Sequence, residues 1–346
     1  MGRPTPLTVR VVEVVRETPD AHSLVLEPAG VPTERFTYRP GQFLTVRVPS
    51  ERVRGAARCY SLCSSPHHDE KLRITVKRTV DGYGSNWICD NVVAGDTLEV
   101  LRPAGTFTPD SLEHDFLLLA AGSGITPVMS ILKSCLYAGT GSLTLVYANR
   151  DERSVIFRDE LASLAAEFGD RLTVVHWLES VQGLPTEPGL RALTRMCTGR
   201  EVFVCGPGPF MDLAVLTLGG LGVPSGQVHM ERFASLAADP FASPDPAAHA
   251  GPAGPVSQVE VELDGTTRTV AWPRNTRLLD ALLDAGVDAP YSCREGNCSA
   301  CTCLLVEGEA AMENNQVLGE CDLADGYVLA CQALPLSERL KITYDG

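Results

Sequence analysis

Residues 291–301 read Tyr291-Ser-Cys-Arg-Glu-Gly-Asn-Cys-Ser-Ala-Cys301, and Cys331 follows after 29 intervening residues. Cys293, Cys298, Cys301 and Cys331 therefore show the spacing of four thiolates that hold two irons and two sulfides. Zinc sites usually have two pairs of closely spaced ligands. Here the fourth cysteine is single and distant, so the spacing fits zinc poorly. Gly296 and the small residues Ser292, Ser299 and Ala300 would let the loop approach the sulfurs and point its amide N–H groups at them. The pattern predicts a [2Fe–2S] cluster, which carries one electron at a time.

Composition limits the function classes. The chain has 346 residues, which is too long for a single hydrophobic core, so two or three domains are expected. A net charge of −14 argues against nucleic acid or an anionic membrane surface as a partner. The first ten residues contain no apolar run of signal-peptide length, and no stretch of the chain reaches the roughly 20 apolar residues of a membrane span. We therefore expect a cytoplasmic protein with reduced cysteines, most of which, including Cys59, Cys303 and Cys321, act as inert packing residues.

The clearest domain boundary is a linker at residues 236–256, which is rich in Pro, Ala and Gly and has little periodicity. Residues 257–346 follow as a ferredoxin-like module with an α+β, β-grasp pattern: two alternating strands joined by Asp264-Gly265, a helix at 278–286, the cysteine loop, and two further strands. This module contains 15 Asp and Glu against 6 Lys and Arg. Such an acidic face could steer a basic partner or only aid solubility.

The chain before the linker shows two different periodicities. Short alternating runs over residues 1–112, for example at 43–48, predict an antiparallel β-barrel, because closure buries such strands without open edges. Residues 113–235 switch to apolar runs that alternate with helical stretches, which predicts an α/β domain with a parallel sheet and helices on both faces. The predicted fold class is thus multidomain, and the second domain has a nucleotide-binding architecture.

One candidate site in that domain is the turn Gly122-Ser123-Gly124-Ile-Thr126-Pro127, which follows the first strand and opens a helix. The glycines would let the backbone approach a pyrophosphate, and the helix N-terminus supplies N–H donors. The second strand ends in Asn149 and Arg150, without an acidic residue. Arg150 and Arg153 could meet an adenosine ribose or a 2′-phosphate, although Asp151 and Glu152 would oppose the phosphate. For Arg153 a solvated loop is an equal alternative.

A second candidate site is Arg58-Cys-Tyr60-Ser61 in the barrel region. A Tyr can stack on a planar ring, a Ser can bond a ring nitrogen and an Arg can clamp a phosphate. Its partner segments contain Thr75 and Lys77, then the anion-binding nest residues Gly84, Ser85 and Asn86. A Tyr in a strand is more often a core residue, so composition alone makes this a weak motif.

These motifs together resemble the ferredoxin–NADP⁺ reductase superfamily over nearly the whole chain. Arg58-x-Tyr60-Ser61 resembles the flavin signature, Gly84–Asn86 the flavin phosphate loop and Gly122–Pro127 the nicotinamide pyrophosphate loop. The turn Cys205-Gly206-Pro207 resembles the one beside the nicotinamide. Met230-Glu-Arg-Phe233 resembles the end of the nucleotide domain, where Glu231 lies near the flavin and Phe233 covers its ring. The resemblance implies an NAD(P)H-dependent oxidoreductase.

A narrower resemblance is to the reductase components of 3-ketosteroid 9α-hydroxylases, carried by residues 58–65, 147–157, 176–180 and 288–296. It implies FAD, a [2Fe–2S] cluster, NADH (with NADPH possible) and a transient complex with a separate Rieske oxygenase, with the reductase itself a monomer. Alternatives are a phenylacetyl-CoA epoxidase-type reductase, which shares the domain order and feeds a di-iron centre, the reductase of another aromatic oxygenase system, and a redox-sensing module. Related phthalate-dioxygenase-type reductases share this domain order but use FMN.

The cofactors implied by the resemblance give a direction of electron flow. Nicotinamide would pass hydride to the flavin, with Ser61 and Thr126 at the contact, Tyr60 stacked on the flavin, Cys205 near the nicotinamide and Glu231 near the flavin. Plant-type clusters lie near about −400 mV and Rieske centres above about −150 mV, so delivery to such a centre is downhill. No histidine lies close to a cysteine pair, so oxygen activation is expected in another protein.

Overall fold

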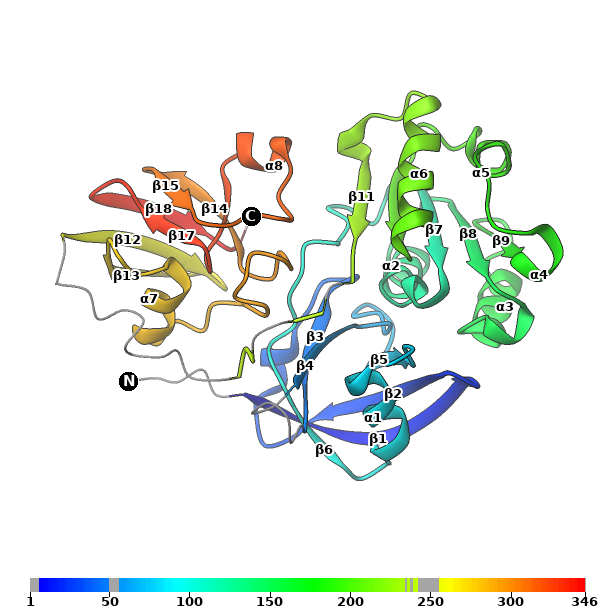
Figure 1. The fold of residues 1–346 in the computed structure, drawn as a ribbon, viewed down its shortest axis with the longest axis horizontal. Helices are drawn as coiled ribbons and strands as arrows, with labels where there is room; N and C mark the ends of the chain where they lie inside the picture. Colours follow the sequence, from blue (N-terminus) through cyan, green and yellow to red (C-terminus); the bar gives the residue numbers. More distant parts are fainter. Residues whose placement is uncertain (1–5, 50–55, 234, 237–238, 242–254, 346) are drawn as a thin grey trace.

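The computed structural model describes residues 6–49, 56–233, 235–236, 239–241 and 255–345. Most of the predicted linker, 236–256, lies outside these residues. The described parts form a β-barrel, a nucleotide-type α/β domain and a ferredoxin-type domain, and the barrel lies below the other two in Figure 1. Among the described residues, no helix has the length and apolar character needed to cross a membrane.

The barrel is an antiparallel sheet of six strands in the order β4-β3-β6-β1-β2-β5. A bridge between Leu62 and Ile74 joins its two edges and closes it, which confirms the predicted barrel. Alternate residues, such as Val9, Val11 and Leu24, are at most 1% exposed because side chains of a strand point to opposite faces. Its elements are β1 (Leu7–Thr18), β2 (Ala21–Pro28), β3 (Phe43–Val48), β4 (Ala56–Ser61), β5 (Leu72–Lys77), α1 (Tyr83–Asn91) and β6 (Thr97–Val100).

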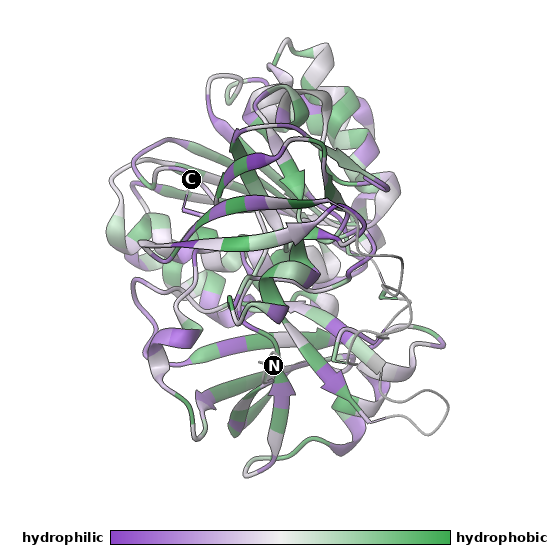
Figure 2. Cartoon of the chain, turned by 90° about the vertical axis from the view of Figure 1, so that its left-hand side faces the viewer, coloured by the Kyte–Doolittle hydropathy of each residue, from purple (hydrophilic) through white to green (hydrophobic). Residues whose placement is uncertain are grey.

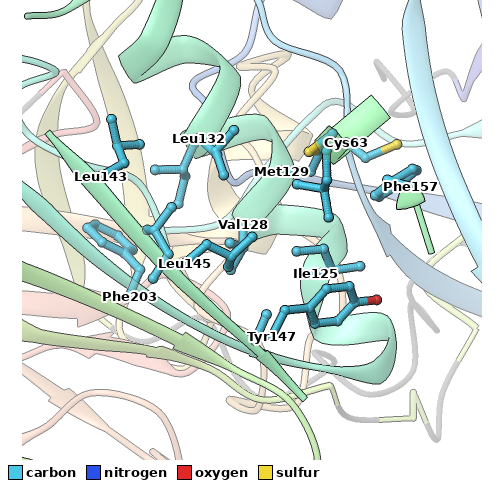
Figure 3. Close-up of a cluster of buried hydrophobic side chains, with 14 of the residues drawn as sticks. Cys63, Ile125, Val128, Met129, Leu132, Leu143, Leu145, Tyr147, Phe157 and Phe203 are labelled. Atoms are coloured by element: carbon cyan, nitrogen blue, oxygen red, sulfur yellow. The ribbon is translucent and has the colours of Figure 1, made fainter. Parts of the chain in front are cut away.

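The nucleotide-type domain has a parallel sheet in the order β11-β10-β7-β8-β9. Leu118 and Ala120 of β7 face a core shared with α2 and α3, whereas Leu117 and Leu119 face a core shared with α5 and α6. Figure 3 shows the first core, with Tyr147 and Phe203 among its members. The elements are β7 (Phe116–Ala121), α2 (Ile125–Ala138), β8 (Leu143–Asn149), α3 (Arg158–Glu167), β9 (Leu172–Leu178), α4 (Glu179–Gln182), α5 (Glu187–Thr194), β10 (Glu201–Cys205), α6 (Gly208–Gly220) and β11 (Val228–Glu231).

This strand order places the site. From β7 the chain builds β8 and β9 on one side and then crosses back to place β10 on the other side, so a crevice opens where β7 and β10 end. The loops after these two strands begin at Gly122 and Gly206. Both predicted nicotinamide motifs therefore lie at the switch point of the sheet.

The ferredoxin-type domain has a sheet in the order β13-β12-β18-β14-β16, with β12 and β18 parallel. Helix α7 packs on it through Leu278 and Leu282, which share a core with the fully buried Trp272. Figure 2 shows apolar and polar colours changing from residue to residue along strands, as half-buried strands require. The elements are β12 (Val256–Leu263), β13 (Thr266–Pro273), α7 (Leu278–Asp284), β14 (Thr302–Glu307), β15 (Ala310–Met312), α8 (Glu320–Ala324), β16 (Tyr327–Leu329), β17 (Ala333–Pro335) and β18 (Arg339–Thr343).

Candidate functional site

The cysteine loop between α7 and β14 is folded by unusual backbone angles and local hydrogen bonds. Arg294, Gly296 and Ser299 all have positive φ. A Cβ on Gly296 would lie 2.9 Å from the carbonyl oxygen of Asn314, so a side chain there would clash. The Asn314 amide in turn donates to the carbonyl of Glu295 at 2.6 Å. The loop is therefore held tightly against the segment that precedes α8.

The four predicted ligands lie together. Hydrogen bonds from the thiols of Cys298 and Cys331 lower the pKa of Cys293, and Cys331 also contacts Cys301. Two loop N–H groups donate to the Cys293 sulfur at 3.3 Å each, and the Cys331 N–H donates to the Cys301 sulfur at 3.4 Å. Backbone N–H groups aimed at thiolates are what a cluster of this kind requires. The donor set fits a [2Fe–2S] cluster.

Cys303 lies 2% exposed in β14, packed in the core of the ferredoxin-type domain. Burial raises the pKa of its thiol, which agrees with a packing role. The side chain of Cys321 is outside the described part of the structure.

The structure brings the two predicted flavin segments together. A Cβ on Gly84 would lie 2.9 Å from the Cγ of Arg58, so the Arg58 stem crosses the first turn of α1. Ser85 and Asn86 bond the backbone of Thr79 and fix that turn. The N-terminal turn of a helix suits a phosphate. Gly84–Asn86, expected to form a phosphate loop, lie in the first turn of the helix Tyr83–Asn91.

Other residues of the same strands have separate surroundings. Tyr60 is half-buried, and Ser61 is 4% exposed at the end of β4. Thr75 is 4% exposed, and its hydroxyl lies 2.7 Å from that of Ser23 inside the barrel. Lys77, predicted beside the flavin, extends to the dinucleotide loop, where its Nζ lies 3.7 Å from the position of a Cβ on Gly122.

The dinucleotide loop packs directly against the end of β10. A Cβ on Gly124 would lie 2.1 Å from the Cys205 carbonyl oxygen, so only glycine allows this approach. Pro207 directly precedes α6. Thr126 is 2% exposed, and its hydroxyl donates to the carbonyl of Ser123 at 3.0 Å. Burial raises the pKa of the Cys205 thiol, which keeps it protonated and unsuited to act as a nucleophile.

Asn149 and Arg150 lie where β8 ends. Asn149 is 8% exposed, and its side-chain oxygen and nitrogen have no hydrogen-bond partner among the described residues. Such buried polar groups are rare unless a ligand or water meets them. The neighbouring Tyr147 hydroxyl already donates to the Gly122 carbonyl at 3.0 Å. An unpaired amide at the carboxyl end of a strand fits a bound nucleotide.

One pocket is lined by all three domains. The barrel contributes Cys59 and Ser61, the nucleotide-type domain Glu231 and Phe233, and the ferredoxin-type domain Asn297 and Cys298. Burial raises the pKa of Glu231 to about 8, so this carboxyl is largely protonated near neutral pH. Phe233 is 52% exposed at the rim. A predicted flavin residue and a predicted cluster ligand thus face the same space.

The comparisons with known proteins agree with this geometry. An oxidoreductase FAD-binding domain family matches residues 8–108, an oxidoreductase NAD-binding domain family matches 118–215, and a 2Fe-2S iron-sulfur cluster binding domain family matches 261–336. The ferredoxin reductase component of 3-ketosteroid-9-alpha-monooxygenase from Mycolicibacterium smegmatis is 56% identical over 98% of this chain and 97% of its own. The chain belongs to this family of ferredoxin reductase components.

The reductase is also similar to more distant proteins. A 1,2-phenylacetyl-CoA epoxidase subunit from Escherichia coli is 33% identical over 98% of this chain and 97% of its own. The solved structure of phthalate dioxygenase reductase matches with a TM-score of 0.56 and 28% identity, and covers 98% of both chains. These findings confirm the predicted fold class and identify an NAD(P)H-dependent flavin and iron–sulfur oxidoreductase.

Sequence reasoning missed the residues that join the barrel to the cysteine loop. The Thr45 hydroxyl donates to the Ser292 hydroxyl at 2.8 Å, and the Cys59 sulfur lies 3.2 Å from the same oxygen. Thr45 and Ser292 are each 1% exposed. The only sequence signal for Cys59 is its position within the motif Arg58-x-Tyr60. Thr45 has no sequence signal that would predict its contact.

Proposed function

We propose that this reductase takes electrons from NADH with bound FAD and passes them singly, through a cluster held by Cys293, Cys298, Cys301 and Cys331, to a separate Rieske oxygenase. The pocket lined by Ser61, Glu231 and Cys298 supports this proposal, because it joins the three domains at one point. When bound, the flavin supplies the conversion between a two-electron donor and a one-electron carrier.

The proposed roles of the chain's residues follow from their positions. Tyr60 and Ser61 orient the flavin ring, while Arg58 and the first turn of α1 hold its phosphates. The loop from Gly122 to Pro127 and the turn at Cys205 hold the dinucleotide, with Thr126 close to the nicotinamide. Glu231, protonated through its raised pKa, could hold a proton beside the flavin.

We propose a 3-ketosteroid 9α-hydroxylase as the oxygenase system, since the relative from Mycolicibacterium smegmatis carries that name. The reductase would act as a monomer in the cytoplasm and meet its oxygenase transiently. The acidic charge of residues 257–346 supports a basic docking surface on the oxygenase. A phenylacetyl-CoA epoxidase system is the second candidate, because the Escherichia coli relative covers nearly the whole chain.

Reconstitution tests the oxygenase assignment. Purified reductase, NADH, a 3-ketosteroid and the oxygenase component of such a system should give the 9α-hydroxylated product, detected by mass spectrometry. An oxygenase that is active with its own reductase but yields no product here would contradict the steroid assignment. Product from a phenylacetyl-CoA epoxidase core under the same conditions would favour the second candidate.

The cluster assignment is tested separately by Cys298→Ser. This variant should lose the visible absorbance of the cluster and transfer to cytochrome c, because one thiolate ligand is removed. Reduction of ferricyanide by NADH should persist, since the flavin and nucleotide sites lie on other domains. Cys303→Ser is the matched control and should keep the cluster. Loss of both activities in Cys298→Ser would show that the domains do not function separately.

A further inference from the structure

A carboxylate of the barrel reaches the nucleotide-type domain beside the dinucleotide loop. Asp20 lies in the turn between β1 and β2, and its Oδ2 lies 2.8 Å from the guanidinium of Arg150. The same oxygen lies 3.9 Å from the Nζ of Lys77, which itself borders Gly122. Asp20 therefore stands between two cations that border the predicted nucleotide site.

The position of Asp20 is fixed by its own domain. The Thr18 hydroxyl donates to Asp20 Oδ1 at 2.7 Å, and the backbone N–H of Arg78 donates to the Asp20 carbonyl at 2.7 Å. Burial alone would raise its pKa, but the Thr18 hydrogen bond and the charges of Lys77 and Arg150 hold the pKa below its usual value. The carboxylate is thus ionised and aimed at Arg150.

The neighbouring Asp151 does not take the place of the Asp20 carboxylate as the partner of Arg150. Asp151 turns back to bond Ser154, with distances of 2.9 Å to its N–H and 2.7 Å to its hydroxyl. Arg153 is exposed. The buried, unpaired amide of Asn149 directly precedes Arg150 and points to a ligand at the end of β8. In folds of this kind, the group after the second strand meets the adenosine ribose.

We propose that Asp20 sets the preference for NADH over NADPH, because it occupies Arg150 and fixes a negative charge where a ribose 2′-phosphate would lie. A free Arg150 could pair with that phosphate, whereas Asp20 offsets part of the positive charge of the Arg150 that it holds. A ribose 2′-hydroxyl carries no charge and is not repelled. The inference rests on the nucleotide site of the proposed function.

The test compares two ligands that differ at one phosphate. Adenosine 2′,5′-bisphosphate and 5′-AMP are titrated into the complete, cofactor-loaded reductase by calorimetry. Because Arg150 is 65% exposed and water screens the pair, we expect Asp20→Asn to tighten binding of the bisphosphate by about tenfold. Affinity for 5′-AMP should stay within about threefold. The kcat/KM ratio of NADPH to NADH, measured with ferricyanide, should rise in parallel.

Two further variants make the result specific. Asp90→Asn removes a barrel carboxylate that pairs with Arg78 at 2.6 Å, and it should leave the ligand ratio unchanged. The double variant Asp20→Asn, Arg150→Gln should not bind the bisphosphate more tightly than the unaltered protein, because it lacks the guanidinium that Asp20→Asn makes available. Asp20→Ser serves as a second variant if Asp20→Asn does not fold.

Equal changes for both ligands, or no change, would overturn the proposal, because Asp20 would then only hold two domains together. Failure of the unaltered protein to reduce ferricyanide with either nucleotide would contradict the proposed function instead, so the two failures are distinguishable.

Discussion

The barrel contacts the other two domains in different ways. Toward the nucleotide-type domain it contributes Ala21, Cys63 and Phe107 to a shared apolar core, and Figure 3 shows Cys63 beside Met129 and Phe157. Toward the ferredoxin-type domain, Leu101 joins the core of that domain, and Phe43 and Ala104 pack against Ala300. The first contact is part of one continuous core, whereas the second combines apolar contacts with the buried Thr45–Ser292 hydrogen bond and with charged pairs.

Charge distinguishes the two contacts further. Lys133 of α2 is 2% exposed between Asp69 of the barrel and Glu160, which also binds Arg73. At the ferredoxin contact, Arg102 pairs with Asp264 and Asp288, and these carboxylates are 66% and 39% exposed. Buried pairs are costly to break, whereas exposed pairs are weak and screened by salt. The comparison suggests that the nucleotide-type domain stays in place while the cluster domain can be released.

The largest expected effect is at the first contact. Lys133→Ala would leave two carboxylates without their shared cation, so we expect the free energy of unfolding to fall by about 3 kcal/mol. Urea denaturation followed by circular dichroism measures this. The control is Lys71→Ala, whose exposed pair with Glu27 at 2.7 Å should contribute less than about 1 kcal/mol. Equal losses in both variants would remove the distinction between the two contacts.

An intermediate effect is expected where the barrel touches the cysteine loop. Thr45→Val leaves the buried Ser292 hydroxyl without its donor, at a cost of about 1–2 kcal/mol, or roughly tenfold in the docked population. The rate at which NADH reduces the cluster, measured in a rapid-mixing experiment, should fall by a similar factor. The rate of ferricyanide reduction should stay unchanged. Thr45→Ser keeps the hydroxyl and should restore the rate. If the serine variant were as slow as valine, the hydrogen bond would not be the cause.

The smallest effect concerns the charged rim of the same contact, where Arg35 also pairs with Asp288. Raising the salt concentration from about 0.05 to 0.5 M shortens the range of electrostatic attraction and should slow cluster reduction by no more than about threefold. Arg102→Ala should remove most of this salt dependence. Arg10→Ala, which breaks a surface pair with Glu27 at 2.9 Å within the same domain, should leave the salt dependence intact. Salt dependence that persists without Arg102 would contradict a role for this rim.

Much of the fold was predictable because its signals are local. Alternating residues indicated strands such as β3, predicted at 43–48 and observed at Phe43–Val48. Helix α1 was missed because residues 83–86 are rich in small and polar types, which favour loops. Its formation depends on burial of Ile88, 1% exposed, against the barrel. Lys77 was predicted to bind the flavin, and only the packing of two domains places its Nζ beside Gly122 as well.

The sequence by itself determined the four cluster ligands, the glycine-rich loop and the three kinds of domain, because ligand spacing, backbone freedom and hydrophobic period act over a few residues. Only the tertiary structure decided which ordinary side chains meet between domains. Thr45 and Ser292 are 247 residues apart, and Asp20 and Arg150 are 130 apart. A threonine or an aspartate has no local signal for such a partner, since the contact exists only once the separately folded domains pack together.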